Sequence, residues 1–295
     1  MIPLFQQRDF GNKINATFQY VSQNFRSLGL ALLYIVGPVA LLAGIMAGFM
    51  ESYRLRLVSE SVNARTDNPF AAFQVIEFFS SPVFWLTMLF GLLANVVVVL
   101  VTYAHMKVYE RLKSPDVLVA DVWAEVQPVI GRALVISLLG SIITAVGMCF
   151  LFIPGIYIAV VLSLALAVTS FEGTGFGETW ERCFKLIRDK WWSTFGLIMV
   201  MALIMAIVGI IFAIPTASVA FLVRAKILPE ASTAWAVIGK VIEQIGRTML
   251  NAVVYLAIGF QYTNLVERQE GRGLISAIDS IGTSTQARDS NEGEY

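Results

Sequence analysis

The sequence predicts an all-α, polytopic membrane protein with six transmembrane helices. Residues 133–171 contain no charged side chain, and the run is interrupted only by Ile153, Pro154 and Gly155. One bilayer crossing needs about 20 apolar residues, so this run predicts two crossings joined by a tight turn. The chain of 295 residues is 57% hydrophobic and only 14% charged. Soluble domains carry about 25% charged residues, so the deficit indicates a lipid-facing surface.

The apolar runs predict the crossings in order, within one membrane domain of residues 1–270: 28–50, 83–104, 132–152, 155–171, 193–214 and 247–265. The first run is longer than the apolar core of a signal peptide, so we expect it to be retained. The fifth charge-free run, 191–223, is too long for one upright helix, and Pro215 is expected to end or kink the crossing there.

Lys and Arg are unevenly divided between the two sides of the predicted membrane domain. The N-terminal segment, the second loop, the fourth loop and the C-terminus together carry most of them. The positive-inside rule therefore places this set of segments in the cytoplasm, with both termini inside.

Three segments before the odd-numbered crossings, 10–25, 118–133 and 176–191, share one spacing of apolar residues. The spacing traces one face of an α-helix, so each segment predicts an amphipathic helix in the cytoplasmic interface. Polar residues, Lys13 among them, form the opposite face of the first. Ser-Pro-Asp at 114–116 is a start signal for the second.

The even-numbered crossings resemble one another. Residues 95–100 (NVVVVL) are similar to residues 251–256 (NAVVYL). We therefore interpret the chain as three pseudo-repeated pairs of crossings, each preceded by an interfacial helix. Convergent composition of Val- and Leu-rich helices is the alternative. Asn95 and Asn251 hold matching repeat positions and are expected to form an inter-helix polar core.

The connections outside the crossings carry their own signals. The first outer loop, 51–82, and the third outer loop are each expected to hold a short helix, at 70–79 and 230–245, because Pro opens both segments. Residues 271–295 are polar and predict a mostly disordered cytoplasmic tail.

Several segments resemble a known family: FKLIRDKWWSTFG at 184–196, IPGIY at 153–157, NLVER at 264–268, GL at 273–274 and IDSIG at 278–282. They are similar to the six-helix membrane domain fused to some bacterial glycerophosphoryl diester phosphodiesterases, and to its uncharacterised standalone relatives. The resemblance spans most of residues 10–282. It implies an integral protein of a bacterial inner membrane. The fused relatives owe their catalysis to a soluble barrel for which this chain has no room, so the resemblance does not imply that activity.

Four motifs were weighed against plainer interpretations. Residues 173–177 (GTGFG) lack the strand and the Lys-Ser/Thr of nucleotide loops, so a plain turn is favoured. His105 is expected to be a solvated cap at the end of the second crossing. Residues 44–48 (GIMAG) fit a small-xxx-small motif that packs helices within one chain. Cys149 and Cys183 lie in different surroundings, so no disulfide is expected.

Charge placement bears on function. Apart from Arg132 and Arg247, each the first residue of a predicted crossing, no Asp, Glu, Lys or Arg lies in a predicted crossing, whereas proton relays and coupled carriers usually keep such residues near the middle of the membrane. We therefore expect a non-catalytic protein that binds lipid or organises a membrane-protein partner. The alternative is a permease component for a neutral or lipidic substrate. We expect no catalytic or metal site, no cofactor and no nucleic-acid partner. A polar cavity through the bundle would favour transport, and a lateral apolar groove would favour lipid binding.

The third amphipathic segment is the expected lipid contact. Its apolar face suits the acyl boundary, and its basic residues suit an anionic leaflet. Glu178 and Glu181 are expected to pair along the helix with Arg182 and Lys185. A plain anchor for the fifth crossing explains the pattern equally well. The residues expected at the lipid head groups are Arg182, Lys185, Arg188, Lys190, Trp191 and Trp192.

Overall fold

The computed structural model is helical, without a β-strand, over the residues that it describes. These are residues 2–63, 77–150, 152–225, 227, 233–271, 273 and 275. Six helices are long and apolar enough to cross a membrane: Phe25–Arg54, Pro82–Leu112, Ile130–Phe150, Phe152–Glu172, Trp191–Val223 and Ala234–Glu270. Each predicted crossing overlaps one of them, so the predicted six-helix, all-α class is confirmed.

The helices in chain order are α1 Phe10–Gln23, α2 Phe25–Ala31, the π-helix η1 Leu32–Val36, α3 Gly37–Asn63, α5 Pro82–Leu112, α6 Val119–Val126, α7 Ile130–Phe150, α8 Phe152–Leu162, α9 Ala165–Glu172, α10 Phe176–Ile187, α11 Trp191–Arg224 and α12 Thr233–Glu270. Helices α2, η1 and α3 follow one another without a break, and a turn at 163–164 separates α8 from α9.

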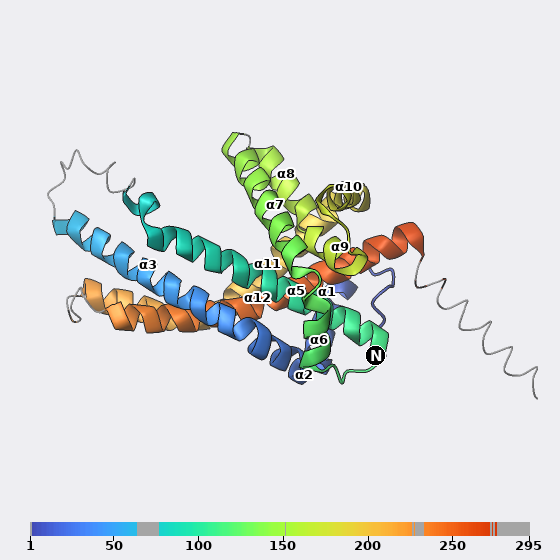
Figure 1. The fold of residues 1–295 in the computed structure, drawn as a ribbon, viewed down its shortest axis with the longest axis horizontal. Coiled ribbons are helices and arrows are strands. Elements are labelled where there is room, and N and C mark those ends of the chain that lie inside the picture. Colours follow the sequence, from blue (N-terminus) through green and yellow to red (C-terminus); the bar gives the residue numbers. More distant parts are fainter. Residues whose placement is uncertain are drawn as a thin grey trace, which may run out of the picture.

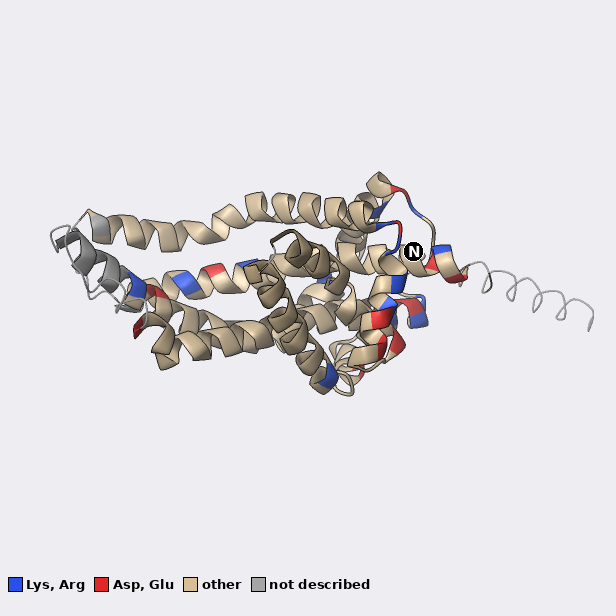
Figure 2. Ribbon diagram, turned by 90° about the horizontal axis from the view of Figure 1, so that it is seen from above, with Lys and Arg blue, Asp and Glu red and all other residues tan. Residues whose placement is uncertain are grey.

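Helices α3, α5, α11 and α12 run along the long axis of the molecule, and the α7–α8 hairpin leans away from this bundle (Figure 1). Helices α1, α6 and α10 lie toward the end of the bundle where the N-terminus lies and α12 ends, which we call the α1 end. Figure 2 shows most charged residues of the described chain gathered at this end. A smaller group lies along α12 toward the opposite end.

Three helices extend further than the sequence predicts. Helix α3 continues beyond residue 50, and α11 continues through Pro215. Helix α12 joins the predicted separate helix at 230–245 to the sixth crossing in one element. Apolar runs mark only the part of a helix that lies in lipid, whereas packing against neighbouring helices sustains it beyond that part. The loop helix at 70–79 and the tail at 271–295 fall mostly outside the described residues.

Proline accounts for the π-helix in the first membrane-length helix. In η1 the backbone N–H of Gly37 donates to the carbonyl of Leu32, five residues earlier. Pro38 follows directly. A proline ring has no N–H and clashes with the carbonyl four residues earlier, and a local π turn relieves that clash.

The small residues of the GIMAG motif pack α3 against α12. A Cβ atom on Gly44 would lie 2.9 Å from Val241 Cα, and one on Gly48 would lie 2.6 Å from Val237 Cα. Backbones approach this closely only where side chains are absent. The prediction that this motif packs helices within one chain is therefore confirmed.

Glycine also sets the contact within the α7–α8 hairpin. A Cβ atom on Gly155 would lie 2.5 Å from the backbone nitrogen of Met148, and one on Gly147 would lie 3.2 Å from Gly155 Cα. A short connection between the two helices is confirmed, since α7 ends at Phe150 and α8 begins at Phe152, but the predicted position of the turn is wrong because Ile153, Pro154 and Gly155 lie within α8. The glycine of the Ile-Pro-Gly segment serves close helix packing, and the chain reverses just before it.

Helix α1 buries a side that includes Lys13, whereas Asn12, Gln19 and Gln23 of the predicted polar face are exposed. Lys13, Thr17 and Tyr20 are almost fully buried, whereas Phe10 and Phe18 are exposed by 39% and 38%. The exposed aromatic side suits a membrane interface. Lys13 was expected on a solvated face, and that prediction is wrong because its ammonium binds groups on α11 and α12, as described below.

Candidate functional site

A cavity of about 470 Å³ lies between the α7–α8 hairpin and the bundle, and it is partly open. Helices α5, α7, α8, α9, α10 and α12 contribute to its lining. Most of the lining is apolar, and no charged side chain is among the described residues that form it. The lining residues that carry a hydroxyl or amide group are Asn95, Tyr103, Ser137, Ser141, Thr144, Ser163, Thr179 and Tyr255.

Helix α7 supplies a stripe of hydroxyl groups to the cavity. Ser137, Ser141 and Thr144 recur at the spacing of one helical face and all line it. Leu138 and Ile142 point away from the bundle and are exposed by 49% and 51%. A helix in lipid turns its apolar side outward, so this distribution assigns the polar side of α7 to the cavity.

Asn95 and Tyr255 face each other across the cavity lining. The side-chain amide of Asn95 donates a hydrogen bond to the hydroxyl oxygen of Tyr255 over 2.7 Å. Both residues lie near the middle of their predicted crossings, 83–104 and 247–265. Because Tyr255 accepts this bond, its own O–H remains available to donate to another acceptor.

Tyr103 is the second phenol of the lining. Its side chain is fully buried, and its hydroxyl has no hydrogen-bond partner among the described residues. Its ring lies 6.1 Å from that of Phe171. Buried hydroxyl groups in folded proteins nearly always have a partner, so this one requires an explanation.

The two asparagines at matching sequence positions are not brought together. Asn251 lies one turn before Tyr255, and its side chain is exposed. It lines a different pocket of about 290 Å³, formed by α11 and α12 with Met205, Gly209 and Arg247 among its other residues. Only Asn95 joins the polar part of the larger cavity.

Helix α10 closes the cavity at the α1 end. Phe176, Thr179 and Trp180 line it. The ring of Trp180 lies 5.2 Å from that of Phe184, which lies 6.3 Å from Tyr157 of α8. The aromatic side that the sequence assigns to lipid therefore faces partly into the protein.

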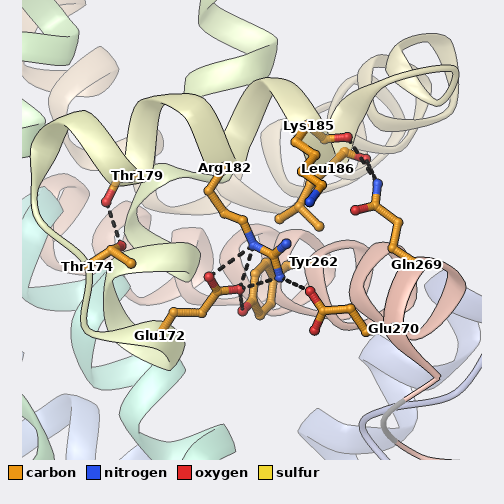
Figure 3. Close-up of polar contacts among 9 residues, drawn as sticks. All are labelled: Glu172, Thr174, Thr179, Arg182, Lys185, Leu186, Tyr262, Gln269 and Glu270. Atoms are coloured by element: carbon orange, nitrogen blue, oxygen red, sulfur yellow. Dashed lines mark hydrogen bonds and ion pairs between the residues drawn. The ribbon is translucent and has the colours of Figure 1, made fainter.

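An ion-pair network holds α10 against α9 and α12 (Figure 3). Arg182 donates to the Glu172 carboxylate from Nε and Nη2, each over 3.0 Å, and also binds Glu270. Tyr262 donates its hydroxyl to Glu172 over 2.7 Å. Burial alone would lower the pKa of Arg182, but its bonds to Glu172 and Glu270 outweigh that effect and raise it.

The backbone of α10 is also fixed to α12. The side-chain amide of Gln269 donates to the carbonyl of Lys185 over 3.0 Å and lies 3.5 Å from the carbonyl of Leu186 (Figure 3). At the start of the helix, the Glu178 carboxylate accepts from the backbone N–H of Gly175. Glu178 thus caps its own helix, and Arg182 pairs with other elements, so the expected pairing of these two along α10 is wrong.

The residues predicted at lipid head groups occupy different surroundings. Arg182 is engaged in the network of Figure 3. Lys185 and Arg188 are exposed, Lys190 is half-buried, and Trp192 is exposed by 77%. Trp191 is half-buried and stacks on Tyr157, with ring centroids 5.7 Å apart. Lipid contact by these residues stays a prediction.

His105 is fully buried, so the expected solvated cap is wrong. Its Nδ1 lies 2.8 Å from the Tyr20 hydroxyl, and its Nε2 lies 3.1 Å from the Ser27 hydroxyl. The imidazole therefore joins α5 to α1 and α2. The Tyr20 ring packs edge-on against Tyr109, whose hydroxyl accepts from the backbone N–H of Ile2.

A second polar cluster at the α1 end surrounds Lys13. Its ammonium donates to Gln261 Oε1 over 2.6 Å and to Ser193 Oγ over 3.2 Å. Gln261 in turn donates to the Thr194 hydroxyl over 2.8 Å. Burial lowers the pKa of Lys13 to about 8, and the positive charge of Arg268 adds to this effect.

Toward the opposite end, α12 carries three linked charges. Glu243 is 7% exposed, and its carboxylate lies 3.0 Å from both Lys240 Nζ and Arg247 Nε. Lys240 and Glu243 precede the sixth predicted crossing, and Arg247 is its first residue. Their spacing of three and four residues was the available signal, since oppositely charged residues so spaced meet on one helical face.

The remaining sequence motifs are structural. Gly173 has φ +71° and ends α9, residues 173–175 form a plain connection, and Phe176 and Gly177 already belong to α10. Cys149 is exposed and Cys183 is buried, and both are free. Burial raises the pKa of the Cys183 thiol to about 12.

Comparisons with protein-family models, with curated proteins and with solved structures find no match for this chain.

Proposed function

We propose that this chain is a non-catalytic integral membrane protein that binds lipid in the cavity between α5, α7, α8, α10 and α12. The observation that carries the proposal is the cavity itself: its volume of about 470 Å³ suits a small ligand, it is partly open, and its lining is mostly apolar. Ligand pockets typically measure about 300–1,000 Å³ and combine apolar walls with a few polar groups. A mostly apolar, partly open cavity among membrane-length helices favours a lipid ligand, whereas transport of a polar substrate across the bilayer needs a polar path through the bundle.

We further propose that the α1 end faces the cytoplasm of a bacterial inner membrane, with both termini there. Helices α1, α6 and α10 would then lie in the cytoplasmic interface, one before each pair of crossings, as expected for a threefold pseudo-repeat. The excess of Lys and Arg in these segments supports this orientation. Exposed Lys185, Arg188 and Trp192 would meet the head groups of an anionic leaflet.

Single cysteines test the orientation. Ser80 is exposed near the start of α5, and Ser114 follows its end at the α1 end. In a Cys149→Ser background, an impermeant maleimide added to intact cells is expected to label Ser80→Cys and to spare Ser114→Cys until the cells are opened. External labelling of the second variant would reverse the orientation.

A matched pair of substitutions tests lipid binding. Ser141 lines the cavity, and its neighbour Ile142 points outward. Ser141→Trp fills the cavity, whereas Ile142→Trp adds the same bulk on the lipid side. With a phospholipid carrying a diazirine in its acyl chain, crosslinks to cavity residues of α5 and α10 are expected in the wild type and in Ile142→Trp. They are expected to disappear in Ser141→Trp.

Crosslinks that Ser141→Trp leaves in place would contradict lipid binding in this cavity. Mass spectrometry of the digested protein locates them, and circular dichroism of each variant shows that the fold is kept.

A further inference from the structure

The cavity presents several hydroxyl groups for which the described residues provide no acceptor. Tyr255 accepts from Asn95, so its O–H has no acceptor in this pair. The buried Tyr103 hydroxyl has no partner among the described residues. On α7, Ser141 donates to the carbonyl of Leu138, and Ser137 and Thr144 make no hydrogen bond within the described part of the chain. A ligand with acceptor oxygens would satisfy these groups.

The position of these donors limits the kind of lipid. Asn95 and Tyr255 lie near the middle of their predicted crossings. A charged phosphate at that depth is costly, and the described lining offers no cation to pair with it. In a phospholipid, the charged head group holds the ester carbonyls near the interface. A carbonyl reaches the middle of the bundle only in a lipid without a charged head group.

We propose that the cavity selects an uncharged lipid that places a carbonyl oxygen against the hydroxyl groups of Tyr255 and Tyr103. This inference rests on the proposed lipid-binding function and names its ligand class. Two sources share the chemistry: a diacylglycerol, through its ester carbonyls, and a lipid quinone, through its ring carbonyls. A hydrocarbon chain alone fills the volume but leaves the donors unpaired.

The test compares a diester lipid with a diether that lacks only its carbonyl groups, and adds a quinone as the second source of carbonyls. The full-length protein in detergent micelles is incubated with 1,2-dioctanoylglycerol, with its 1,2-dioctyl ether analogue, or with a short-chain benzoquinone, and the retained molecules are measured by native mass spectrometry. We expect the diester or the quinone to be retained at least fivefold more than the diether. Retention of one of the two identifies the source, and retention of both supports the shared chemistry.

Conservative variants connect the preference to the phenols. Tyr103→Phe removes a hydroxyl that has no partner, so the fold is expected to persist and the fivefold preference to fall toward one. Tyr255→Phe is expected to act in the same direction. Tyr157→Phe, on α8 but outside the cavity lining, is the matched control and keeps the preference.

The outcomes separate this inference from the function on which it rests. If the diether is retained in the same amount as the diester and the quinone, and Ser141→Trp abolishes retention of all three, then the cavity binds lipid but the preference for a carbonyl group is refuted. If Ser141→Trp leaves retention unchanged, lipid binding in the cavity is refuted as well. If both Tyr→Phe variants keep the wild-type preference, the assignment of the phenols is refuted.

Discussion

Replacing Arg182 with Gln tests whether the network of Figure 3 holds α10 in place. The substitution keeps much of the side-chain length but removes the charge that pairs with Glu172 and Glu270. The side chains of Arg182 and Glu172 are only 15% and 14% exposed, and that of Glu270 is 30% exposed. Without the guanidinium group, the carboxylates of Glu172 and Glu270 lie close together without a cation between them. The carboxylate of Glu172 is also largely desolvated.

The expected loss of stability follows from these exposures. Removing one partner of a fully buried ion pair costs about 3–5 kcal/mol, and an exposed pair contributes about 0–1 kcal/mol. The network is mostly buried but reaches the surface through Glu270, and Tyr262 still donates to Glu172. We therefore expect Arg182→Gln to lower the free energy of unfolding by roughly 2–3 kcal/mol.

This change in the free energy of unfolding is measured by unfolding the protein with sodium dodecyl sulfate in mixed micelles and monitoring helix content by circular dichroism. Lys113→Gln is the control, because Lys113 pairs with Glu110 across a well-exposed contact in which Lys113 is 64% exposed. It is expected to change stability by less than about 1 kcal/mol. Amide exchange should also accelerate in α10 and not in α6. Equal effects of the two variants, or unchanged exchange in α10, would refute the reasoning.

Three further predictions concern helix packing, pH and thiol reactivity. Gly48→Ala is expected to destabilise the protein by about 1–3 kcal/mol by overpacking against α12, whereas Gly91→Ala, which meets nothing within 4 Å, should be neutral or stabilising in the same unfolding assay. Because burial lowers the pKa of Lys13 from 10.5 to about 8, the folded state binds fewer protons than the unfolded state between these values. Stability should therefore rise from pH 8 to about pH 10.5, and Lys13→Met should remove that rise; a pH profile identical to the wild type would contradict it. In the folded protein, maleimide should modify the exposed Cys149 and spare Cys183, because burial raises the pKa of the Cys183 thiol to about 12. Mass spectrometry of labelled peptides measures the modification of each cysteine, and rapid modification of Cys183 would contradict the prediction.

The helices of this protein are readable from sequence because lipid restricts the backbone. Every N–H and C=O in the hydrocarbon region must be paired internally, so a sufficiently long apolar run has only one regular solution in an all-α chain. The run at 133–171 therefore predicts both α7 and the α8–α9 segment. The spacing of apolar residues likewise predicts α1, α6 and α10, because it depends only on the helical repeat.

The ends of the helices are harder to predict from the sequence, because the constraint that lipid imposes stops at the hydrocarbon boundary. Beyond the hydrocarbon, polar residues are compatible with helix or loop, and packing decides between them. Thus Lys240 falls in the separate outer helix predicted at 230–245, and Arg247 falls at the start of the sixth predicted crossing. In the structure both lie within α12, where Glu243 pairs with both. Pro215 was expected to end or kink the fifth crossing, and the helix does not end there but continues to Arg224.

The candidate site depended on tertiary structure. The partners that define it are far apart in the chain: Asn95 binds Tyr255, Arg182 binds Glu270, and Lys13 binds Gln261. No helical period encodes such pairs. A single sequence shows that α7 has one hydroxyl-bearing side, but not whether lipid, a neighbouring helix or a cavity lies against it. The lean of the α7–α8 hairpin away from the bundle decides that question, because it leaves the hydroxyl side facing a space that the protein's own side chains do not fill.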